Sequence, residues 1–119
     1  MTDPPPPVPL PEEDRRDSPR LPLRVMVRDP AVGGSFEERP GDLALGGVRY
    51  RDGHPPRGGR LEVRVLLPGT RTEVRCRGEV VRVTREDGAF AVHLRFAGLA
   101  DGDERAIARL LDAAARGRP

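Results

Sequence analysis

Residues 72–96 read TEVRCRGEVVRVTREDGAFAVHLRF and indicate the kind of fold more clearly than any other part of the chain. Apolar and polar residues alternate on both sides of the Glu-Asp-Gly turn at 86–88. This alternation has the period of a β-strand with one buried face, and Asp-Gly is a strong signal for a hairpin turn. The alternation changes phase between Val80 and Val81, which predicts a β-bulge or sharp bend there. The stretch is therefore predicted to form a hairpin with a long first strand.

The same alternation recurs nearer the N-terminus, over residues 21–28 and 61–67. Turn residues separate these strands at 29–34, at 51–59 and at Pro68-Gly69. Between them, residues 35–39 predict a weak, polar strand and residues 48–50 a short one. The Gly-bracketed segment 41–47 is predicted to be a short apolar loop. Five or six short strands joined by turns are typical of a small antiparallel barrel.

The C-terminal segment changes to a helical period, with apolar residues at 107, 110, 111 and 114. Asp101 and Glu104 have the spacing of a capping box, which would place the start of the helix at Asp101. Arg116 and Gly117 suit its end. The sequence thus predicts a mainly β domain with one C-terminal α-helix packed on its side.

Composition limits the class of protein. The chain has 119 residues, enough for one domain, and its 14 Gly, 14 Pro and 3% aromatics exclude a helical bundle or a coiled coil. No apolar run approaches the roughly 20 residues of a membrane helix, so no membrane partner is expected. Residues 1–14 are Pro-rich and predict a disordered tail rather than a secretory signal. The folded domain is predicted to span 15–116.

The charge balance and the cysteine content limit which partners and which cell compartment are expected. All 21 basic residues are Arg, but 19 acidic residues leave a net charge of only +2. With so few aromatics to stack on bases, this balance disfavours a protein that binds DNA or RNA. The single cysteine, Cys76, excludes an internal disulfide and a cysteine-cluster zinc site. A reduced, cytoplasmic protein is expected.

The sequence offers few residues that could carry out catalysis. His54 lies in a loop and His93 in a strand, and neither has a Cys or carboxylate at metal-ligand spacing. Cys76 lies within a strand, where it is better suited to the core than to nucleophilic attack. We expect no catalytic residues, no metal and no cofactor, and therefore not an enzyme.

Two polar motifs remain. Arg16 and Arg20 stand four residues apart across Pro19, so an extended backbone would separate their Cα atoms by about 13 Å. Each guanidinium can grip a phosphate or the O6/N7 edge of a guanine. In the second motif, Asp42 can accept guanine N–H groups, while Ala44 and Gly47 are small enough for a ligand to approach the backbone. Together they favour a negatively charged guanine nucleotide as the ligand. Alone, the first motif is more typical of a solvated flank than of a site, and the second is more typical of a turn.

In this order, the two motifs resemble those of the PilZ domain family, bacterial receptors for the second messenger cyclic di-GMP. Arg16 and Arg20 match its Arg-x-x-x-Arg motif, and Asp42, Ala44 and Gly47 match its Asp/Asn-x-Ser/Ala-x-x-Gly motif. The resemblance covers residues 15 to about 115 and implies a six-stranded antiparallel barrel with a C-terminal helix. It also implies that the two arginines bind guanine and phosphate, and that the second motif recognises a guanine.

The resemblance suggests further residues that could contact the ligand, and at position 44 the sequence lacks the serine found in other members. Ala44 replaces the serine that the motif also allows, which removes a hydroxyl contact. Arg15 is similar to basic residues that accompany binding of a stacked ligand pair. Gly46 and Arg82 are additional candidate contacts; Arg82 would stack on a guanine face or, alternatively, face solvent as an ordinary strand arginine.

The resemblance implies a cyclic di-GMP binding effector that changes conformation and signals to an unidentified protein partner, in motility, exopolysaccharide or related control. The alternative is a PilZ-like adaptor that binds proteins but no longer binds the nucleotide. A small barrel that binds RNA or DNA is the third hypothesis, and the composition disfavours it.

Overall fold

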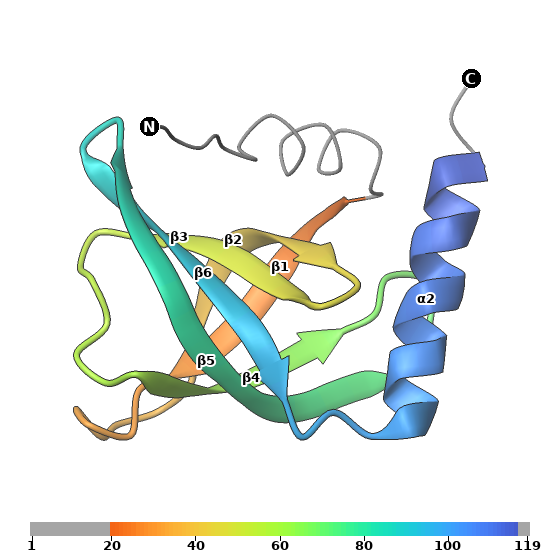
Figure 1. The fold of residues 1–119 in the computed structure, drawn as a ribbon, viewed down its shortest axis with the longest axis horizontal. Coiled ribbons are helices and arrows are strands. Elements are labelled where there is room, and N and C mark those ends of the chain that lie inside the picture. The colour runs from red at the N-terminus through yellow and green to blue at the C-terminus, as the bar shows by residue number, and fades with distance from the viewer. Residues whose placement is uncertain (1–19, 117–119) are drawn as a thin grey trace, which may run out of the picture.

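The computed structural model describes residues 20–116 of the chain. Within this range, six antiparallel strands close into a barrel and one helix follows them (Figure 1). Around the barrel the strands follow the order β1-β2-β3-β6-β5-β4, and β4 pairs back with β1. The elements are β1 (Leu21–Arg28), β2 (Glu37–Ala44), β3 (Gly47–Asp52), β4 (Arg60–Leu66), β5 (Glu73–Glu86), β6 (Ala89–Ala97) and α2 (Asp101–Arg116). The predicted fold, a mainly β six-stranded barrel with a C-terminal helix, is confirmed. The predicted tail at 1–14, together with Arg15 and Arg16, lies outside the described residues.

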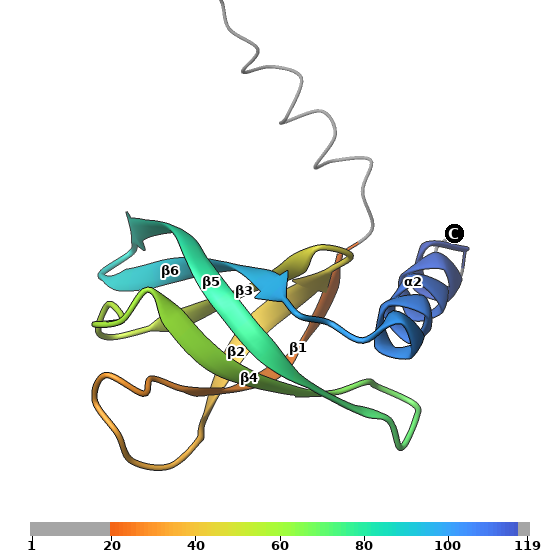
Figure 2. The same cartoon turned by 60° about the horizontal axis from the view of Figure 1, so that its bottom comes forward.

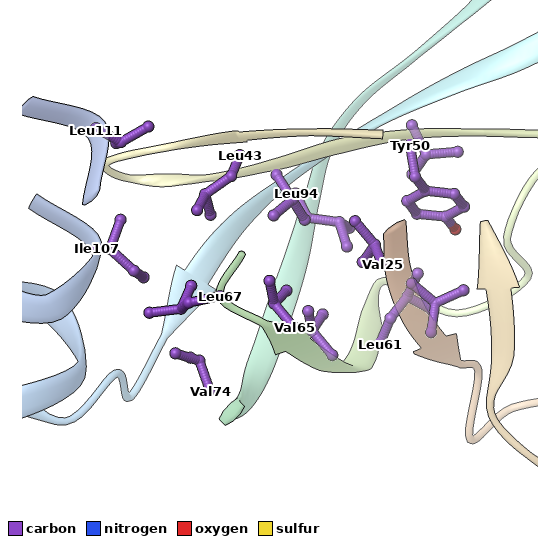
Figure 3. Close-up of a cluster of buried hydrophobic side chains, with 14 residues drawn as sticks. Val25, Leu43, Tyr50, Leu61, Val65, Leu67, Val74, Leu94, Ile107 and Leu111 are labelled. Carbon is purple, nitrogen blue, oxygen red and sulfur yellow. The ribbon is translucent and has the colours of Figure 1, made fainter. Parts of the chain in front are cut away.

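The core fills the inside of the barrel with inward-facing aliphatic side chains, because alternate residues of each strand point to opposite faces. Helix α2 stands beside the barrel (Figure 2). It adds Ile107 and Leu111 to the core, both almost fully buried. In Figure 3 these two side chains lie at the same end of the core cluster as Leu43 and Leu67, so the helix closes that end. Cys76 packs against this core, and burial, with Asp103 nearby, raises the pKa of its thiol to about 11. It is a core thiol, as the sequence indicated.

The β5–β6 hairpin has the predicted turn and the predicted irregularity. Asp87 and Gly88, which connect the strands, both have positive φ (51° and 80°), as the tight turns of twisted hairpins require. Val80 pairs with Leu94 and Arg82 with His93, so Val81 has no partner on β6. Val81 is therefore the bulged residue, and the phase change in the sequence located it correctly.

The predicted loop over 41–47 is wrong. Strand β2 continues to Ala44 and β3 begins at Gly47, so only Leu45 and Gly46 connect them. Gly41 and Gly47 allow neighbouring strands to pack closely, and they do not form a loop. A Cβ atom on Gly41 would collide with the carbonyl oxygen of Arg49, and one on Gly47 with that of Leu94. Strand β3 is also longer than the predicted strand at 48–50, because it extends to Asp52.

The helix begins at Asp101, as predicted, but the residue that caps it differs from the prediction. The backbone N–H of Glu104 donates to the carbonyl of Ala100 at 2.9 Å, so Ala100 and not Asp101 occupies the cap position. Asp101 already belongs to the first helical turn, together with Asp103 and Glu104. These carboxylates face the positive end of the helix dipole and stabilise the helix there without forming the predicted capping box.

Candidate functional site

A pocket of about 230 Å³ lies on the barrel surface beside the β2–β3 turn. It brings together the described residues of both sequence motifs. Arg20 comes from the chain just before β1, Asp42 and Ala44 from β2, Gly46 from the turn, and Gly47 from the start of β3. The remaining lining residues are Val48, Arg49, His93 and Leu94. Arg15 and Arg16 lie outside the described residues, and the binding roles of all these residues stay predictions.

Strand register aligns the polar side of the pocket. Asp42 on β2 pairs with Arg49 on β3, and Arg49 in turn pairs with His93 on β6. The neighbouring residues Leu43, Val48 and Leu94 are buried in the core. Because strand residues alternate between faces, the row Asp42–Arg49–His93 lies on the outer face of the barrel. We call these three residues the cross-strand row.

Asp42 is held in a fixed geometry by its neighbour in the row. Nη2 of Arg49 donates to Oδ2 of Asp42 at 2.8 Å. The two side chains retain 25% and 34% of their exposure, so the pair is open to solvent and to a ligand. The bond uses one of two carboxylate oxygens. A carboxylate fixed in this way presents an acceptor to donors such as the N–H groups of a guanine.

The two glycines of the turn have different physical roles. Gly47 is buried and its missing side chain makes room for the backbone of β6, a requirement of the barrel itself. The sequence predicts that Gly47 makes room for a ligand, and the structure shows that the packing of β3 against β6 also requires a glycine here. Gly46 is exposed and has open space where a Cβ would stand. Its carbonyl accepts the N–H of Phe96 at 2.9 Å, which ties the turn to β6.

Sequence reasoning missed two residues of the pocket, Arg49 and His93. Arg49 lies outside the motif, two positions after Gly47, and His93 stands on a strand 44 residues further along. Only the strand register brings them beside Asp42, so no local pattern could have identified them. Burial lowers the pKa of His93, and the nearby charges of Arg82, Arg49 and Arg20 lower it further. The imidazole is therefore neutral at neutral pH.

Arg82, a further candidate contact, does not line the pocket. It pairs with His93 from the β5 side and is exposed. Its charge nonetheless reaches the pocket, since it lowers the pKa of His93. The structure therefore places Arg82 at the border of the site, next to the cross-strand row.

A larger hollow of about 700 Å³ lies elsewhere, between the β1–β2 and β3–β4 connections, and several of its charged side chains bond to other groups of the same hollow. Arg39 pairs with Glu37 at 2.6 Å and with Asp52 at 3.0 Å. Asp29 accepts three backbone N–H groups, from Ala31, Arg57 and Gly58. These bonds tie the two loops together, so we assign this hollow a structural role. His54 belongs to it; this histidine takes no part in the strand pairing of the cross-strand row and does not line the pocket beside the β2–β3 turn.

Other chemistry is not evident in the described part of the chain. Among residues 20–116, no group of three or more His, Cys, Asp or Glu side chains is placed to hold a metal ion. Within the same residues, no helix has the length and apolar character needed to cross a membrane. The pocket beside the β2–β3 turn is thus the candidate site.

The described residues thus form a closed six-stranded barrel with a terminal helix and a surface pocket lined by arginine and aspartate side chains. The PilZ domain family matches residues 14–113, and the chain belongs to that family. PilZ domains are receptor or adaptor domains rather than enzymes.

A solved structure agrees on the fold. The chain is similar to the Bacillus subtilis inhibitor of motility (MotI/DgrA), with a TM-score of 0.67 and 18% sequence identity. The similarity covers 87% of this chain and 53% of that one, so this chain spans about half the length of its structural neighbour. Comparison with curated proteins gives no match.

Proposed function

We propose that this protein is a non-enzymatic, cytoplasmic receptor for cyclic di-GMP that signals to a protein partner. One observation carries the proposal: Arg20, Asp42, Ala44, Gly46 and Gly47 line a single pocket, although the chain positions that supply them belong to two separate motifs. Membership of the PilZ family supports the choice of ligand.

The pocket offers the two kinds of group that a guanine dinucleotide requires. Asp42 supplies a carboxylate to accept the N–H donors of a guanine. Arg20, with Arg16, supplies guanidinium groups for the phosphates or the guanine O6/N7 edge. Ala44 supplies no hydroxyl, so recognition rests on the charged side chains and the backbone around Gly46. No step of this binding requires a catalytic group or a metal.

Signalling would follow from where Arg20 stands in the chain. It directly precedes β1, and Leu21 pairs with Leu43 beside the second motif. Seating Arg16 and Arg20 on a ligand would fix the segment leading into the barrel and alter the surface available to a partner. One structural neighbour is named as an inhibitor of motility, which supports a motility protein as the first partner to test.

Isothermal titration calorimetry with cyclic di-GMP tests the receptor function, with GTP and cyclic di-AMP as competitors for specificity. Arg20→Ala and Asp42→Ala should each weaken binding by about 10- to 150-fold, the effect of losing a hydrogen bond to a charged group. Arg24→Ala is the matched control, because Arg24 is a 69% exposed arginine of β1 outside the pocket. Equal affinity in all three variants would refute the site.

The second candidate function is an adaptor that binds proteins but not the nucleotide. Two observations favour it: position 44 lacks a hydroxyl, and Arg49 already occupies one oxygen of Asp42. An NMR titration separates the two functions. Cyclic di-GMP should shift the amide signals of residues 42–47 if the chain is a receptor, whereas unchanged signals at millimolar nucleotide would support the adaptor.

A further inference from the structure

His93 occupies the centre of the polar surface at the pocket. On one side it pairs with Arg49 of β3, and on the other with Arg82 of β5. It is half-buried and lines the same pocket as Arg20 and Asp42. A ligand seated in this pocket therefore meets an imidazole flanked by guanidinium groups. Neither sequence motif includes this histidine.

Charged groups approach His93 from several elements. Arg20 reaches it from the start of β1, Arg49 from β3, and Arg82 and Glu86 from β5. Asp42 of β2 lines the same pocket, but Arg49 already engages it. The cations outnumber the carboxylates, and burial acts in the same direction, so the pKa of His93 falls below its usual 6.5. The pocket thus presents a neutral imidazole within a cationic surface.

We propose that His93 is a further ligand-contacting residue, which binds a phosphate group of the cyclic dinucleotide as an imidazolium ion, so that binding takes up one proton. This inference rests on the proposed function. A cyclic dinucleotide carries two phosphodiester charges, which oppose the repulsion from the three arginines and favour the charged ring. The proton comes from solvent, and both ring nitrogens of the imidazolium are then donors.

The sign of the pH dependence follows from this coupling. Above the pKa of His93 in the complex, the ring is neutral with and without ligand, and affinity does not vary. Between that pKa and the lower one of the free protein, binding takes up a proton, and affinity rises as pH falls. The limiting slope is about tenfold in affinity per pH unit for one proton. Below the pKa of the free protein, affinity becomes constant again.

Calorimetry on the full chain with cyclic di-GMP tests the coupling, at pH 6.0 to 8.0 and in buffers of different ionisation enthalpy. The wild type should take up as much as one proton, and His93→Gln should take up none and bind about tenfold or more weakly at pH 6. His93→Arg should bind without pH dependence, because its charge is permanent. His54→Gln is the matched control, since His54 belongs to the other hollow, and should behave as the wild type.

NMR of the wild-type chain gives an independent readout, because the pKa of the His93 ring should rise when ligand is added. Tight binding with no proton uptake, and with an unchanged His93 pKa, would overturn the role of His93 while leaving the receptor function intact. Absence of binding at every pH would overturn both.

Discussion

Gly47 of β3 lies against the backbone of β6, and the destabilisation caused by replacing it can be measured. A Cβ atom at this position would collide with the Leu94 carbonyl, which belongs to the backbone and cannot rotate away. Gly47→Ala should therefore lower the free energy of unfolding by about 1–3 kcal/mol, as overpacking does. Chemical denaturation measures this, with Gly46→Ala as the control, because Gly46 faces open space. Equal stability of the two variants would contradict the close approach.

The Asp42–Arg49 pair should contribute little to stability despite its short bond. Both side chains are about a quarter to a third exposed, where water screens the attraction. A double-mutant cycle with Asp42→Ala and Arg49→Ala should give a coupling energy of about 0.2–1 kcal/mol in urea unfolding. A coupling above about 2 kcal/mol would mean that the pair belongs to the core architecture and not to the pocket.

The candidate site shows what a local pattern can and cannot predict. Asp42, Ala44 and Gly47 stand within six residues, so one motif names them and the turn then brings them together. Arg49 and His93 enter the pocket through strand pairing, which depends on the register of the whole barrel. Sequence reasoning placed His93 in a strand correctly but could not determine which residues would face it.

Among the elements, β2 was the hardest to predict, because its sequence opposes strand formation. It contains Pro40 and Gly41, which are poor strand residues. Pairing with β1 on one side and β3 on the other overrides this preference. By contrast, β5 and β6 were predicted well, since their alternating side chains and Asp-Gly turn agree with their place in the barrel.

Helix α2 depends on two anchors for its contact with the barrel. Ile107 is fully buried and Leu111 is 3% exposed. Ile107→Ala should lower the free energy of unfolding by about 2–5 kcal/mol, through lost burial and the cavity left behind. Arg109→Ala, on the exposed side of the same helix turn, should change it by less than about 0.5 kcal/mol. Thermal unfolding of the two variants compares them; a similar loss in both would mean that the helix contact is wrongly placed.

The stability of the whole molecule should fall in two steps as pH decreases. His93 has a lowered pKa in the fold, so the unfolded chain takes up its proton first and stability declines just below pH 6.5. Asp29 has a pKa below its usual 3.8, because three backbone N–H bonds outweigh the effect of burial. The pKa of Glu73 is also lowered, by bonds from Arg75 and Arg64. Stability from these carboxylates is present above about pH 4 and is lost as they protonate.

Urea unfolding between pH 8 and pH 3 resolves the two steps. His93→Gln should remove the upper step and leave the acid step unchanged. An upper step that persists in His93→Gln would show that His93 is not its source.

The hydrogen bond from Phe96 to Gly46 has a consequence for the C-terminal helix. Phe96 lies near the end of β6, just before the Gly98 bend (φ 73°) and α2. The turn that borders the pocket is thereby coupled to the backbone that carries the helix. A bound molecule that immobilises Gly46 should therefore slow deuterium exchange at the Phe96 amide. Exchange at this amide would report whether the pocket is occupied, and the hydrogen bond would be the first link between a bound ligand and the helix.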